Sequence, residues 1–167
     1  MILRWLVVLA GLFAAAVASQ LPEFSQQYQQ RLGGAVDALA EVVADFDASA
    51  QAEGLSRDAA LSQMRGTAFL DRRRSDMTRT FVRYDTLRHD LVALQGAGPV
   101  VRTYHVVRSP DFEVGAAALD TFEPAVPLTA AGAMFAGTGF LAGWLAMWGV
   151  LRLLAWPFRR HRTARGT

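Results

Sequence analysis

The densest cluster of side chains that could bind a ligand is the run Arg72, Arg73 and Arg74. Guanidinium groups bind phosphate through paired hydrogen bonds, so this run could contact lipid head groups or an acidic partner. Asp71 and Asp76 flank the run at spacings that allow ion pairs along a helix. A solvated helix face with internal pairing explains the same residues, and the sequence leaves both interpretations open.

Side chains suited to catalysis or metal binding do not form a recognisable pattern. The histidines, His89, His105 and His161, have no Asp, Glu or His three or four residues further on, the spacing that places two ligands on one helix face. No G-x-S-x-G or S-x-x-K motif accompanies the serines. We therefore predict a protein that is not an enzyme, with no catalytic residue, no metal site and no cofactor.

Small residues recur at steps of three and four in an apolar stretch near the C-terminus, and a shorter set occurs near the N-terminus. Glycine and alanine at these steps let two helix backbones approach closely inside a membrane. The helices could pack within one chain or between the subunits of a homo-oligomer, although alanine and glycine are also simply abundant here. The candidate packing residues are Gly11, Ala15, Gly132, Ala136, Gly139 and Gly143, and Ala18 and Ala146 continue the two stripes.

Polar and aromatic side chains follow the N-terminal apolar stretch. Amides and an ion pair at this position could bind a membrane-protein partner, or the chain segment that enters the second stretch at Pro127. The candidate interaction residues are Gln20, Pro22, Glu23, Gln27, Tyr28 and Arg31.

Two apolar stretches would hold these residues at a lipid bilayer. Residues 128–151 carry no charge and would form about 36 Å of helix, enough to cross a hydrocarbon core of about 30 Å. We predict transmembrane helices at 1–21 and 128–156. The first stretch can also be interpreted as a cleaved signal peptide, because residues 16–18 have the A-x-A pattern of a cleavage site.

The distribution of charge predicts the orientation. Arg4 precedes the first stretch and further arginines follow the second, whereas every Asp and Glu lies between the two. The positive-inside rule then places both termini in the cytoplasm, with 157–167 as a basic tail, and the middle domain in the periplasm of a bacterial inner membrane. Because orientation explains the basic tail, we expect no nucleic-acid partner.

The middle segment, 22–127, has helical patterning, with apolar residues about every 3.7 positions at its start. We predict an all-α membrane protein with outer helices at about 23–50, 57–95 and 110–121. The segment 100–108 is rich in valine and is expected to be extended.

Capping residues and a heptad pattern refine this arrangement. Gly54 should end the first outer helix, Ser56 should cap the second and Ser109 the third. Apolar residues at sevens in the second outer helix predict a seam that packs on the first, forming an antiparallel coiled-coil hairpin. The seam residues at sevens are Leu70, Met77, Tyr84 and Leu91, and Phe81, Leu87 and Leu94 fill in the seam between them.

The residues SQLPEFSQQYQQRLGG, at 19–34, resemble the opening motif of a proteobacterial membrane-protein family known as domain of unknown function 2937. Residues 124–129, PAVPLT, are similar to a second marker of that family. The resemblance covers nearly the whole chain. It implies that the first span is retained, and it implies no activity, substrate or cofactor.

Two functions from different classes fit these features. The first is an inner-membrane accessory, scaffold or assembly protein, with membrane lipid and a membrane protein as partners. The second is an extracytoplasmic ligand-sensing module, because bacterial input domains also place helices between two spans. A tail of about a dozen residues is too short for a signalling domain, so a sensor would act through a partner protein.

Overall fold

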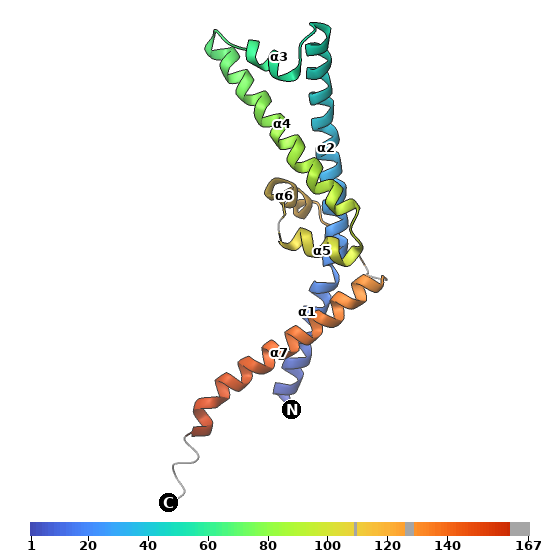
Figure 1. The fold of residues 1–167 in the computed structure, drawn as a ribbon. Coiled ribbons are helices and arrows are strands. Elements are labelled where there is room, and N and C mark those ends of the chain that lie inside the picture. The colour runs from blue at the N-terminus through green and yellow to red at the C-terminus, as the bar shows by residue number, and fades with distance from the viewer. Residues whose placement is uncertain (109, 126–128, 161–167) are drawn as a thin grey trace, which may run out of the picture. The chain divides into compact units, whose positions relative to one another are not determined.

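The computed structural model describes residues 1–108, 110–125 and 129–160 of the chain (Figure 1). Its regular secondary structure in these residues is entirely α-helical, which confirms the predicted all-helical class. The helices are α1 (Ile2–Ser19), α2 (Leu21–Ala52), α3 (Arg57–Gln63), α4 (Ala68–Gln95), α5 (Pro99–Arg108), α6 (Phe112–Asp120) and α7 (Ala130–Arg160).

The helices form two compact units. The span unit comprises Met1–Ser25 and Phe122–Thr167, and the bundle unit comprises Gln26–Thr121. In the span unit α7 crosses α1 (Figure 1), and the two helices are in extensive contact. Among the described residues, two helical stretches are long and apolar enough to cross a membrane: Leu3–Ala52, of which α1 is the first part, and Ala130–Leu154 of α7.

The backbone of α1 and α2 is interrupted at Gln20. The Gln20 N–H donates to the Val17 carbonyl, a tightened final turn of α1. Pro22 lies in the first turn of α2, where its missing N–H costs nothing because the first N–H groups of a helix have no partner within it. Pro22 therefore marks the boundary between α1 and α2.

The bundle unit has an apolar core where α2 and α4 meet. Val43 of α2 and Met77 and Phe81 of α4 are buried there. The rings of Phe46 and Phe81 lie edge to face, with their centroids 5.2 Å apart. Leu61 of α3 packs against the same cluster, so three helices share one core.

An ion pair fastens α3 over this core. Both ends of the Arg57 guanidinium bond the Asp47 carboxylate, with Nε 2.8 Å from Oδ1. This bonding holds the pKa of Asp47 below its usual range. The same guanidinium lies 4.6 Å from the centroid of the Phe81 ring, a cation–π contact. Arg57 therefore ties α3 to both α2 and α4.

Local backbone conformation and side-chain hydrogen bonds decide where α2 ends and where α3 and α6 begin. Gly54 has φ +71°, a left-handed conformation that favours glycine, and it ends α2 as predicted. Ser56 caps α3 as predicted, accepting the Ala59 N–H at 3.3 Å. The predicted cap Ser109 lies outside the described residues, and the N-cap of α6 is Asp111. Phe112, not residue 110, is therefore the first residue of the last helix of the bundle unit.

Two predictions about α3, α4 and α5 were wrong. The predicted helix 57–95 is two helices, separated at Gly66 with φ +101°. The segment 100–108 is the helix α5 rather than extended chain. Burial of Thr103 and Val106 outweighs the weak helix propensity of the valines, because packing overrides local preference.

The buried residues of α4 all belong to the predicted heptad seam, but other members of that seam are only partly buried. Its buried residues are Met77, Phe81, Leu87 and Leu94, while Leu70, Tyr84 and Leu91 are only partly buried. The N-terminal half of α4 contacts the α2 and α3 core, and α4 also contacts α5. Because α4 packs on different helices along its length, one heptad position does not describe its buried side.

Candidate functional site

The closest helix contact in the span unit is formed by glycines of α7. A Cβ atom on Gly139 would lie 2.5 Å from the Ala18 Cβ and 2.6 Å from the Ala14 carbonyl oxygen. One on Gly143 would lie 2.5 Å from the Ala14 Cβ and 2.8 Å from the Ala10 carbonyl oxygen. Only glycine permits this approach, because the nearest atoms include backbone that no rotamer change can move.

The α1 side of this contact is a row of alanines at every fourth position, Ala10, Ala14 and Ala18. The predicted stripe on this helix was Gly11, Ala15 and Ala18, and Ala18 does lie against Gly139. Gly11 is buried against the Phe140 ring, whereas Ala15 is half-buried and none of its atoms is among those closest to the two glycines. Ala10 and Ala14 were not predicted, although they form an A-x-x-x-A-x-x-x-A pattern with Ala18.

The other predicted packing residues lie nearer the start of α7. Gly132 is buried, and its N–H donates to the Thr129 hydroxyl at 3.1 Å, which satisfies one of the unpaired donors at the helix N-terminus. Ala136 is half-buried. Within this stripe, Gly139 and Gly143 are the residues in close contact with α1 of the same chain.

The predicted juxtamembrane residues are divided between the two units. In the span unit, Gln20 holds the segment that precedes α7: its amide nitrogen donates to the Ala125 carbonyl and its amide oxygen accepts the Ala125 N–H, each at 3.2 Å. Pro22 and Glu23 lie in the first turn of α2, where an acidic side chain favours the helix dipole.

Replacing Gln20 with alanine removes both hydrogen bonds to Ala125. We expect the Ala125 amide to exchange with deuterium about fivefold faster, since an exposed hydrogen bond contributes about 1 kcal/mol. Peptide-resolved hydrogen exchange of the full chain in detergent measures this. Gln26→Ala, at an exposed position on α2, is the control, and unchanged exchange in Gln20→Ala would contradict the role of Gln20.

In the bundle unit, Tyr28 and Arg31 fasten α6 to α2. The Asp111 N–H donates to the Tyr28 hydroxyl at 2.8 Å. Arg31 donates to the Ala117 carbonyl at 3.0 Å, one of the carbonyls at the end of α6 that lack a partner within the helix. Gln27 is half-buried on the same helix as these two residues.

Asp111 is the centre of a polar network that sequence analysis missed. Its carboxylate accepts the Val114 N–H at 3.0 Å and is bonded by both ends of the Arg83 guanidinium, with Nη2 2.9 Å from Oδ1. Arg83 also bonds Glu113 at 2.8 Å. Arg83 and Asp111 are 28 positions apart in the chain, so no local pattern could have revealed the pair.

The network shifts two pKa values for identifiable reasons. Hydrogen bonds from Arg83 hold the pKa of Asp111 below its usual range, because they stabilise the carboxylate. Burial raises the pKa of Tyr28, because the phenolate would lose its hydration, and this effect outweighs the hydrogen bond from Asp111. The network therefore fixes α6 in place through a charged carboxylate and a neutral phenol.

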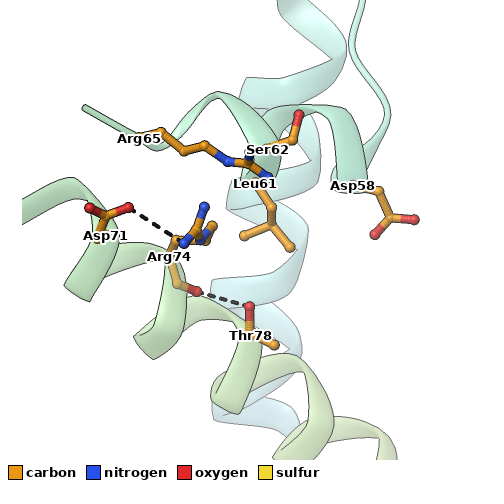
Figure 2. A pocket seen from close by; sticks show the side chains of 7 residues that line it. All are labelled: Asp58, Leu61, Ser62, Arg65, Asp71, Arg74 and Thr78. Carbon is orange, nitrogen blue, oxygen red and sulfur yellow. Dashed lines mark hydrogen bonds and ion pairs between the residues drawn. The ribbon is translucent and has the colours of Figure 1, made fainter. Parts of the chain in front are cut away.

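A polar cleft lies between α3 and α4 (Figure 2). It has a volume of about 540 Å³. Figure 2 shows the side chains of Arg65 and Arg74 extending toward the same space beside Leu61. Arg74 forms an ion pair with Asp71 at 3.4 Å, so the predicted pairing within the arginine run is found for this member. Ser62 and Thr78 add hydroxyl groups to the lining.

In contrast to this polar cleft, α5 exposes apolar side chains. Thr103 and Val106 are buried, yet four apolar side chains of the same helix are exposed. We call these the α5 face: Val100, Val101, Tyr104 and Val107. Tyr104 and Val107 are 56% and 57% exposed, respectively. On α6, Phe112 is 86% exposed.

Among the described residues, no three His, Asp or Glu side chains lie close enough together to hold a metal ion.

Comparison with known proteins gives a family for the chain. A family described as "Protein of unknown function (DUF2937)" matches residues 2–160. No curated protein and no solved structure matches the chain.

Proposed function

Since this chain belongs to the DUF2937 family, whose description gives no activity, we propose from its geometry that it is a membrane-anchored accessory or assembly protein that is not an enzyme. In this proposal α1 and α7 cross a bacterial inner membrane with both termini in the cytoplasm. The bundle unit is periplasmic and is built on antiparallel pairing of α2 and α4 as a hairpin. The arginines outside the spans and the acidic residues between them support this orientation.

The observation that carries the proposal is the α5 face. A helix on the surface of a globular protein normally buries its apolar side and exposes its polar side. α5 instead buries one side through Val106 and exposes a second apolar side through Val101, Tyr104 and Val107. Exposed apolar patches of this kind mark surfaces that bind another protein, and an amphipathic helix typically enters a groove on its partner.

Photo-crosslinking in intact cells tests this function. Benzoylphenylalanine in place of Tyr104 or Val107 should give one discrete crosslinked species with a membrane protein, because both positions lie on the α5 face. Mass spectrometry of that species identifies the partner. The same probe at His89, whose side chain is 86% exposed on α4, should give no discrete species.

The mass of the crosslinked species distinguishes a protein partner on the α5 face from a lipid. A species of twice the chain mass would identify a second copy of this chain as the partner, which still supports assembly through the α5 face. A species whose added mass equals one lipid would place α5 on the bilayer and contradict the proposal. Crosslinking at His89 as strong as at Tyr104 would also contradict it.

Ligand sensing through a partner protein is the second candidate function. The cleft between α3 and α4 supports it, because two arginines, Arg65 and Arg74, and two carboxylates, Asp58 and Asp71, line a volume of about 540 Å³. Such a lining suits a small polar molecule that both donates and accepts hydrogen bonds. A small molecule retained in that cleft when the protein is purified in mild detergent would favour sensing, whereas a retained protein complex favours assembly.

A further inference from the structure

A second concave surface lies within the span unit. α1 and α7 border a groove of about 840 Å³ at the end where α1 begins and α7 nears its last turns. Val7 and Val8 line it from α1, and Trp144 and Trp148 line it from α7. Gly149 contributes no side chain at its edge, and a Cβ atom there would meet nothing within 4 Å. This groove is separate from the Gly139 and Gly143 contact.

Both charged side chains that line the described groove are arginines, one from each helix. Arg4 comes from α1 and Arg152 from α7. Each interrupts or borders an apolar segment, where an isolated charge is costly unless it reaches the interface or a counter-ion. Two guanidinium groups on one groove therefore favour an anion between them.

Aromatic contacts hold Arg152 in this position. Its guanidinium carbon lies 4.1 Å from the centroid of the Trp148 ring. Trp148 in turn stacks on Trp144, with the ring centroids 6.3 Å apart and the planes inclined by 10°. A guanidinium that stacks on a ring keeps its N–H groups at its edge, so Arg152 can still donate to a ligand.

We propose that this groove binds an anionic phospholipid, with the phosphodiester between Arg4 and Arg152 and an acyl chain along Val7, Val8 and Trp144. A free anion would satisfy the arginines but would leave the apolar lining exposed. A zwitterionic lipid would bring its own cation near two guanidinium groups, which repel it. The apolar lining and the paired charges together thus match an anionic lipid.

This inference rests on the membrane insertion in the proposed function, and it is independent of the α5 face. Basic pockets between transmembrane helices are suited to anionic head groups, and each arginine near an anionic surface contributes about fivefold in affinity. Two arginines should therefore make an anionic lipid bind about thirtyfold more tightly than a zwitterionic one.

Native mass spectrometry of the full chain in detergent micelles tests the groove. Titration with phosphatidylglycerol and phosphatidylcholine should show the expected preference for phosphatidylglycerol. Arg4→Gln and Arg152→Gln should each weaken phosphatidylglycerol binding about fivefold, and the double variant should bind both lipids alike. Arg88→Gln, at an exposed position on α4, is the matched control and should bind like the wild type.

Two results would overturn the proposal without relying on any variant that misfolds. One is equal affinity of the wild type for the two lipids. The other is displacement of phosphatidylglycerol by inorganic phosphate in excess, which would assign the arginines to a free anion. An undiminished preference in the double variant, with unchanged helicity by circular dichroism, would overturn it as well.

Flotation separates failure of this inference from failure of the proposed function. The wild type and the Arg4→Gln/Arg152→Gln variant should both float with liposomes of phosphatidylcholine alone, because α1 and α7 insert through their apolar length. If neither floats, membrane anchoring itself is contradicted. If both float but show no lipid preference, only the phospholipid site is contradicted.

Discussion

Isoleucine in place of Gly143 is expected to force α1 and α7 apart. The new side chain would start 2.5 Å from the Ala14 Cβ and 2.8 Å from the Ala10 carbonyl oxygen. Backbone cannot rotate away as the tip of a flexible side chain does, so one helix must move as a body. We expect a cost of at least about 3 kcal/mol, the upper end of the usual penalty for overpacking.

Electron paramagnetic resonance can measure this separation, because the chain has no cysteine of its own. Leu9→Cys on α1 and Leu145→Cys on α7 replace exposed side chains, so nitroxide labels there should not disturb the contact. The labelled parent should give one narrow distance distribution. Adding Gly143→Ile should lengthen and broaden that distribution.

Gly137→Ile is the matched control on the same helix. A Cβ atom at Gly137 would meet nothing within 4 Å, so the same change in size should leave the distance distribution as in the parent. Gly139→Ile should behave like Gly143→Ile, because its nearest atoms also include α1 backbone. A parent-like distribution for Gly143→Ile would show that the glycines do not set the contact.

Replacing Asp111 with alanine should release α6 from the bundle unit. The change removes the N-cap bond to Val114 and leaves Arg83 without its better-buried partner. Loss of a cap costs about 1 kcal/mol and loss of a hydrogen bond to a charged group about 1.5–3 kcal/mol, so we expect about 3 kcal/mol in all. Local exchange of α6 amides should accelerate accordingly in the full chain.

Glu113→Gln is the control for Asp111→Ala, because it removes the other carboxylate that pairs with Arg83. Glu113 also pairs with Arg83, but its side chain is 82% exposed, so its pair should contribute less than about 1 kcal/mol. We expect little change in the exchange of α6 amides for Glu113→Gln. Equal effects of the two substitutions would contradict the central role of Asp111.

The stability of the same network should depend on pH at both extremes. Because Arg83 lowers the folded-state pKa of Asp111, this carboxylate contributes stability above its unfolded pKa of about 3.9, and that stability is lost as pH falls through the lower folded value. Burial raises the folded-state pKa of Tyr28, so the neutral phenol stabilises the fold below about pH 10 and the contribution is lost as pH rises above it. Asp111→Ala should remove the acid dependence of α6 exchange, and Tyr28→Phe the alkaline one.

The sequence by itself determined the helical class and the features that depend on neighbouring residues. Gly54 and Ser56 mark the end of α2 and the start of α3, because left-handed backbone and helix capping are decided within a few residues. The apolar length of α7 needs only composition to be recognised. Gly139 and Gly143 could be identified as packing residues from their spacing alone.

Only the tertiary structure decided which faces of these helices are in contact. The spacing of Gly139 and Gly143 does not say which row of α1 they meet, since rotating α1 slightly exchanges Ala15 for Ala14. Burial of Thr103 and Val106 made a helix of a segment whose valines favour a strand. Asp111 and Arg83, far apart in the chain, meet only because the fold brings the N-cap of α6 to α4. Register and pairing between distant helices depend on the fit of whole surfaces, whereas caps and spans depend on a short stretch of chain.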